Sequence, residues 1–152
     1  MFSPDARVLI VGSMPSVKSL ADAQYYAHPR NAFWPIMFAI FGGELTADYE
    51  KKKALIRNHG LALWDAACTC EREGSLDSHM RDIAYNDFEA LYAQCPGIRT
   101  VLCNGGTAHA LFMKSGAAGE RKVVRMPSTS PAYTMPYEKK LNIWKETLHS
   151  VL

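Results

Sequence analysis

Residues 25–31 gather two tyrosines, a histidine, an arginine and an asparagine just before an apolar stretch. Aromatic rings can stack on planar heterocyclic bases, at about 1–3 kcal/mol per base. Tyr26 is the better stacking candidate, because Phe33 and Trp34 belong to the apolar face of the helix expected next. The side chain of Asn31 can position a water molecule and stabilise charge, but a neutral amide cannot accept a proton.

Asn31 also has a purely structural interpretation. It lies just before an apolar helix, where asparagine is a favoured capping residue that contributes about 1 kcal/mol. The residues alone favour the cap over a catalytic role, and both roles can coexist. His28 is more simply a packed ring next to Pro29 than a contact to a phosphate or a base.

Three further polar segments follow short apolar runs. The first, Gly12-Ser13-Met14-Pro15-Ser16, combines a glycine that lets a ligand approach the backbone with a stiffening proline. It lacks the Gly-Lys-Ser/Thr ending of a phosphate-binding P-loop. Asp65 ends the second run and can either read a ligand or cap a turn. Residues 127–133 carry small hydroxyl side chains between two prolines, which suits phosphate contacts and rigid insertion, or simply a stiff connector.

The apolar runs that precede these segments predict buried β-strands. They cover residues 7–12, 61–64, 99–103 and 122–126. Helical patterns lie between and after them, at residues 33–41, 48–59, 86–95 and 107–114 and from Pro136 onward.

Strands that alternate with helices predict an α/β fold, with a parallel sheet between helical layers. Ligands bind beyond the carboxyl ends of the strands in such folds. The segments to search are therefore residues 13–31, 65–81, 104–107 and 127–133, which are expected to be loops.

The composition is that of an ordinary globular protein, with 48% hydrophobic and 21% charged residues among 152. We expect one domain over residues 1–152. A net charge of +2 does not by itself indicate a nucleic-acid binder, so any DNA-binding surface must be a local basic face. Arg121, Lys122 and Arg125 are the candidates for that face.

The four cysteines are Cys68, Cys70, Cys95 and Cys103, and their spacing fits neither a zinc site nor an iron–sulfur site. We expect no metal and no cofactor. The first residues lack the pattern of a signal peptide, and no apolar run approaches the ~20 residues that cross a bilayer. We therefore expect a cytoplasmic protein with no membrane partner.

Taken in order, these segments resemble the uracil-DNA glycosylase superfamily, and more closely its hypoxanthine-DNA (deoxyinosine) glycosylase branch. The resemblance covers almost the whole chain. Its matching residues are Gly-Ser-Met-Pro-Ser at 12–16, Tyr-Tyr-Ala-His-Pro-Arg-Asn-Ala-Phe-Trp at 25–34, Leu-Trp-Asp at 63–65, Arg-Glu-Gly-Ser-Leu-Asp-Ser at 72–78, Asn-Gly at 104–105 and Pro-Ser-Thr-Ser-Pro at 127–131. It implies a three-layer α/β/α sandwich around a four-stranded parallel sheet, with DNA crossing the strand ends.

The resemblance also implies base-excision repair of DNA that contains a deaminated base. Hypoxanthine is the first choice, with uracil or xanthine as further substrates, and the product is an abasic site. Many members orient water with an asparagine or aspartate where this chain has Met14, and the branch is thought to use Asn31 instead. The implied base-binding residues are Gly12, Ser13, Met14, Tyr26 and Asp65, and the implied DNA-binding residues are Ser128, Thr129, Ser130 and Pro131.

Two other functions stay open. A damaged-DNA-binding module with weak or no turnover would explain Met14, because methionine cannot activate water. An N-glycosidase of free nucleosides would need no loop that inserts into a duplex, so residues 127–133 argue against it. A small domain with one DNA face is most simply a monomer.

Overall fold

A parallel four-stranded sheet forms the centre of the computed structural model, which describes residues 1–14, 17–71 and 81–152. The strands lie in the order β2-β1-β5-β6. They are β1 (Val8–Gly12), β2 (Leu61–Asp65), β5 (Thr100–Asn104) and β6 (Lys122–Met126). Each is one of the four predicted strands, with bounds that differ by no more than one residue. The chain passes from β1 to β2 on one side and then crosses to β5 on the other side of β1, and such a switch opens a crevice at the carboxyl ends of the strands.

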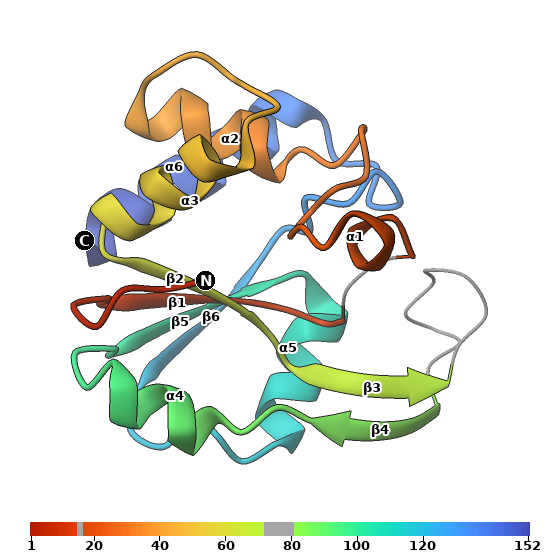
Figure 1. The fold of residues 1–152 in the computed structure, drawn as a ribbon, viewed down its shortest axis with the longest axis vertical. Coiled ribbons are helices and arrows are strands. Elements are labelled where there is room, and N and C mark those ends of the chain that lie inside the picture. Colours follow the sequence, from red (N-terminus) through yellow and green to blue (C-terminus); the bar gives the residue numbers. More distant parts are fainter. Residues whose placement is uncertain (15–16, 72–80) are drawn as a thin grey trace.

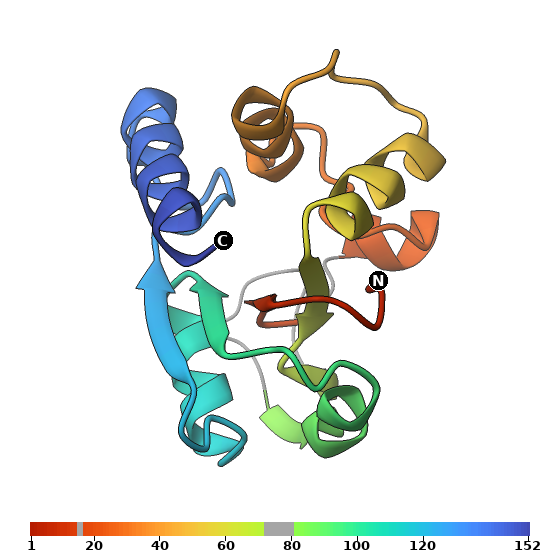
Figure 2. The same ribbon diagram turned by 90° about the vertical axis from the view of Figure 1, so that its left-hand side faces the viewer.

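Helices cover both faces of the sheet, as the predicted three-layer sandwich requires (Figures 1 and 2). One face carries α2 (Phe33–Phe41), α3 (Tyr49–Asn58) and α6 (Tyr137–Val151). The other carries α4 (Phe88–Gln94) and α5 (Gly106–Lys114). The short helix α1 (Val17–Asp22) was not predicted, and Figure 1 shows it on the same side of the molecule as the segment that follows β6.

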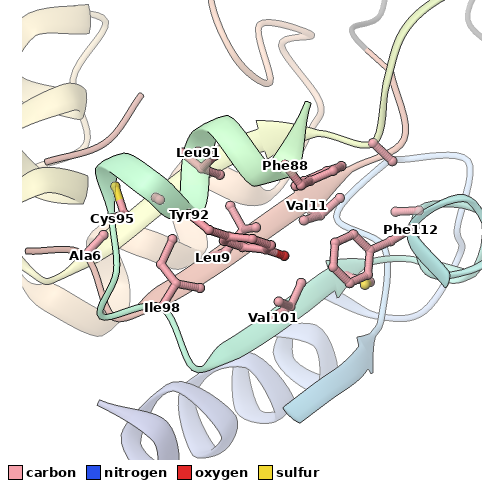
Figure 3. Packing of buried hydrophobic residues seen from close by; sticks show 14 of the residues in the cluster. Ala6, Leu9, Val11, Phe88, Leu91, Tyr92, Cys95, Ile98, Val101 and Phe112 are labelled. Carbon is pink, nitrogen blue, oxygen red and sulfur yellow. The ribbon is translucent and has the colours of Figure 1, made fainter. Parts of the chain in front are cut away.

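The central strand β1 has no exposed side chain among its four aliphatic residues, because helices pack on both of its faces. Val8 and Ile10 pack with α2, α3 and α6. Leu9 and Val11 point to the opposite layer, where α4 and α5 supply aromatic and aliphatic partners (Figure 3). This two-sided burial explains why the strand is a continuous apolar run in the sequence.

The segment at residues 65–81 departs from the prediction, because it is not simply a loop. β3 (Ala67–Glu71) pairs antiparallel with β4 (Arg81–Tyr85) in a separate two-stranded sheet. The register shifts twice along this pairing, and such bulges disturb the two-residue alternation by which a strand is recognised. Pro15, Ser16 and the predicted stretch at 72–78 lie outside the described residues.

Within the described ranges, no helix combines the length and the apolar character needed to cross a membrane.

Candidate active site

A cavity of about 560 Å³ opens at the carboxyl ends of the four parallel strands. Ligand sites commonly occupy roughly 300–1,000 Å³, so the cavity is large enough for a heterocyclic base. Every residue that the sequence proposed for the site lines it. These residues are Gly12, Ser13, Met14, Tyr26, Asn31, Asp65, Ser128, Thr129, Ser130 and Pro131.

The Asn31 side chain borders this cavity and also caps α2. Its Oδ1 accepts a hydrogen bond from the backbone N–H of Phe33 at 2.9 Å. The cap residue Ala32 has no side-chain hydrogen bond of its own, so Asn31 supplies the oxygen that this helix end requires. Among the described residues the Asn31 Nδ2 group has no hydrogen-bond partner. The cap therefore fixes the direction of an amide that still has donors to offer the cavity.

Tyr26 has one ring face covered by the protein. The ring stacks on Phe33, with centroids 4.1 Å apart and planes inclined by 29°. The backbone of Tyr26 is in the left-handed region, at φ 54°, which is uncommon for a residue with a side chain. Only the opposite ring face or an edge of Tyr26 can meet a base.

The Tyr26 hydroxyl stays protonated at neutral pH. Burial raises the pKa of Tyr26 well above its ordinary value, and the negative charge of Asp65 raises it further. A hydrogen bond with the Asn104 side chain acts in the opposite direction but is the weaker influence on this pKa. The hydroxyl is therefore a neutral hydrogen-bonding group among Asp65, Asn104 and Gly12.

The carboxylate of Asp65 lies against Gly12 from the neighbouring strand. The two residues are partners in the β1–β2 register, and only 7% of Asp65 is exposed. A Cβ atom at Gly12 would collide with Asp65 Oδ1. Glycine at position 12 is thus what allows a buried carboxylate to occupy this part of the cavity wall.

Asn104 is a site residue to which the sequence assigned no role. At the end of β5 its Oδ1 accepts from the Thr129 N–H at 2.9 Å, and its Nδ2 donates to Thr129 Oγ1 at 3.0 Å. Gly105 follows with φ 98°, and a Cβ there would come within 2.9 Å of Ser128 Cβ. The Asn-Gly pair therefore holds the segment after β6 close to β5.

The three hydroxyl residues that were predicted to bind DNA differ in how far they are buried. Thr129 is 1% exposed and its hydroxyl is hydrogen-bonded to Asn104, so its side chain attaches the segment to the end of β5. The backbone O of Thr129 also accepts from Ala32 N at 2.9 Å, which joins this segment to the start of α2. Ser128 and Ser130 are only partly buried and Pro131 is exposed, so these three residues are the accessible part of the segment.

One of the three residues predicted to form a basic face, Arg121, is engaged within the protein. Arg121 Nε donates to Ile98 O at 3.1 Å, and its guanidinium lies 3.4 Å from the ring centroid of Tyr92. Lys122 and Arg125 are exposed, but Lys122 begins β6 at the edge remote from the cavity. Of the three, Arg125 is the basic side chain nearest the strand ends, beside Gly106.

The fold and the cavity define an α/β protein with an open cavity at the carboxyl edge of a parallel sheet. A sequence profile of the uracil DNA glycosylase superfamily matches residues 1–150. The chain belongs to this superfamily, as its sequence resemblance predicted, and is a DNA glycosylase by family, a hydrolase of N-glycosyl bonds.

Individual relatives agree with this assignment. A hypoxanthine DNA glycosylase of Methanosarcina acetivorans is 36% identical over 130 residues, which cover 84% of this chain and 81% of the relative. A hypoxanthine DNA glycosylase of Methanosarcina barkeri is 33% identical over 102 residues, which cover 66% of this chain and 65% of the relative. The solution NMR structure of a putative uracil DNA glycosylase from M. acetivorans superposes with a TM-score of 0.79 at 29% identity, covering 99% of this chain and 93% of that one.

Proposed function

We propose that this protein removes a deaminated base from DNA by hydrolysing its N-glycosidic bond and leaves an abasic site. Hypoxanthine is the preferred base, with uracil or xanthine as further substrates. The observation that carries this proposal is the convergence of Asn31, Asp65 and the exposed segment after β6 on one cavity. The names of two relatives, both hypoxanthine DNA glycosylases, support the choice of base.

The target nucleotide must leave the duplex before its base can enter the cavity. Residues 128–131 form one wall of the cavity. Ser128 and Ser130 contact phosphates beside the extruded nucleotide. Pro131 presses on the duplex at the place that the nucleotide has left. Thr129 keeps the segment in place through Asn104 and Ala32. We propose that the protein does this as a monomer.

The bond breaks through an oxocarbenium-like sugar, and the base departs with negative charge. Hydrogen-bond donors aimed at the oxygen of the departing base lower that barrier. Gly12, Ser13 and Tyr26 line the cavity, and we assign this role to backbone N–H groups of the first loop and to the protonated hydroxyl of Tyr26. The phosphates of the bound DNA favour the sugar cation.

Asn31 holds the water that attacks the sugar carbon. Its Oδ1 is engaged with Phe33 N, which orients the amide, and Nδ2 donates to the water. An amide cannot take a proton from that water, so attack comes late, when the cation is well formed, and the proton that the added water loses is taken up by the departed base anion. Met14 lines the same cavity but has no group that orients water.

Asp65 selects the base. Hypoxanthine presents an N1–H donor that adenine lacks, and uracil presents an equivalent N3–H. The buried Asp65 carboxylate accepts a hydrogen bond from this N–H. Adenine has an acceptor in place of the N–H, so the carboxylate would face a second acceptor, and such a mismatch discriminates strongly against adenine.

The test uses labelled duplexes that carry one hypoxanthine, uracil, xanthine or adenine, incubated with the protein and then treated with alkali. Alkali-dependent cutting at hypoxanthine with adenine left intact is the expected result. Tight binding to these duplexes without base release would contradict turnover and establish the alternative function, a damage-binding module, which Met14 favours. Release from free inosine but not from DNA would contradict the DNA substrate.

A further inference from the structure

A lysine is buried near the start of α6, where an unpaired charge would be costly. Lys140 is 4% exposed, whereas the neighbouring Lys139 is exposed. Removing an ammonium group from water is unfavourable unless hydrogen bonds replace the water. The position is also close to the positive end of the helix dipole, which disfavours a cation. Core packing alone explains neither the burial of this charge nor its place near the positive end of the helix dipole.

The hydrogen bonds that replace water around the Lys140 ammonium group go to the segment after β6. Its Nζ donates to Ser130 O at 3.1 Å and to Tyr133 O at 2.8 Å. The same Nζ lies 5.5 Å from the ring centroid of Tyr133. The lysine thus bridges two carbonyl groups three residues apart and closes the turn between them.

This turn has no other hydrogen bond to a helix or strand among the described residues. The preceding residues are held elsewhere, since Trp144 Nε1 donates to Pro127 O at 3.0 Å and Asn104 binds Thr129. The remaining hydrogen bonds of residues 130–133 are local, from Ser130 N to Ser128 Oγ, from Ala132 N to Ser130 Oγ and from Tyr133 N to Ser130 O. Pro131, Ala132 and Tyr133 are exposed at its surface.

We propose that Lys140 is a positioning residue that holds residues 130–133 in the conformation that meets DNA, without touching the DNA itself. The inference rests on the proposed function, in which this turn presses on the duplex. The lysine supplies the hydrogen bonds that join the turn to α6, and its charge strengthens both of these bonds to the carbonyl groups.

The first readout needs no activity. Lys140→Met keeps the length of the side chain and removes its donors, and Lys139→Met is the matched control on the same helix. Amide hydrogen exchange at Ala132 and Tyr133 is expected to accelerate about tenfold or more in Lys140→Met and to stay unchanged in Lys139→Met. Unchanged exchange in both variants would overturn the proposal. So would unprotected Ala132 and Tyr133 amides in the unmodified protein, a result that requires no folded variant.

The second readout compares hypoxanthine in a duplex with hypoxanthine in a single strand, which has no partner strand to displace. Lys140→Met is expected to lower kcat/KM on the duplex by about tenfold more than on the single strand. Equal losses on both substrates would mean a general loss of structure and would contradict the positioning role. If the unmodified protein cuts neither substrate, the proposed function fails, while the exchange experiment still decides whether Lys140 orders the turn.

Discussion

Asn104 and Thr129 form a two-point contact in which one side-chain amide binds both the backbone and the side chain of its partner. The Asn104 Oδ1 accepts from Thr129 N at 2.9 Å, and Nδ2 donates to Thr129 Oγ1 at 3.0 Å. The contact joins the end of β5 to the segment after β6, and Thr129 O in turn accepts from Ala32 beside Asn31. The proposed catalytic amide and the proposed DNA-contacting segment are therefore positioned by one hydrogen-bonded chain.

Replacement of Asn104 should therefore weaken both stability and activity. Asn104→Ala leaves Thr129 N and Oγ1 buried without a partner, which costs about 1–3 kcal/mol of unfolding free energy. Urea unfolding measures that loss. The value of kcat/KM for hypoxanthine release should fall by at least about tenfold at temperatures where the variant remains folded. Full activity in a folded Asn104→Ala protein would show that this contact does not position the site.

Base selection should depend on the carboxylate of Asp65. Asp65→Asn keeps the size of the side chain beside Gly12 but replaces one acceptor oxygen with a donor. We expect hypoxanthine release to fall about 10–100-fold, because the loss of a hydrogen bond to a charged group typically costs about 1.5–3 kcal/mol. Single-turnover rates on hypoxanthine, uracil and adenine duplexes check this. A variant with unchanged rates on all three bases would place base selection elsewhere.

The raised pKa of Tyr26 should make the protein less stable in alkali. The pKa of Tyr26 is raised by burial and then by Asp65, so the folded state keeps its proton above pH 10 while the unfolded chain loses it. The contribution of Tyr26 is full below about pH 10 and is lost as pH rises toward the raised pKa, at up to about 1.4 kcal/mol per pH unit.

Urea unfolding at pH 8 and pH 11 measures this dependence. The free energy of unfolding should fall less between the two pH values in Tyr26→Phe than in the unmodified protein. Tyr133→Phe, at an exposed position, is the control and should behave as the unmodified protein does. Equal falls in Tyr26→Phe and the unmodified protein would mean that Tyr26 ionises as readily in the folded state as in the unfolded chain.

The sequence predicts the layers of this fold well because their signals are local. β1 is a continuous aliphatic run since both of its faces are buried, and α2 ends where Gly42 adopts φ 87°. The pairing of β3 with β4 was missed, because its bulges break the alternation of side chains.

The segments around the cavity could be located from the sequence because ligand sites in such sheets follow the carboxyl ends of the strands, and the family resemblance singled out individual residues within them. What holds those residues in place could not be predicted. In the sequence, Lys140 cannot be told from a solvated lysine such as its neighbour Lys139. Only the tertiary structure shows that its Nζ donates to the carbonyl groups of Ser130 and Tyr133. Asn104 likewise gains its role from Thr129, 25 residues away.

The measurement that tests the central claim most directly is hypoxanthine release under single-turnover conditions by the unmodified protein, Asn31→Asp and Asn31→Ala. Aspartate retains an oxygen that can accept from Phe33 N, so Asn31→Asp should keep the helix end intact. Thermal unfolding of each variant verifies this. We predict rapid release by the unmodified protein and losses of about 100-fold or more in both variants while both remain folded. Near-normal release by a folded Asn31→Ala protein would contradict the assignment of Asn31 as the residue that holds the attacking water.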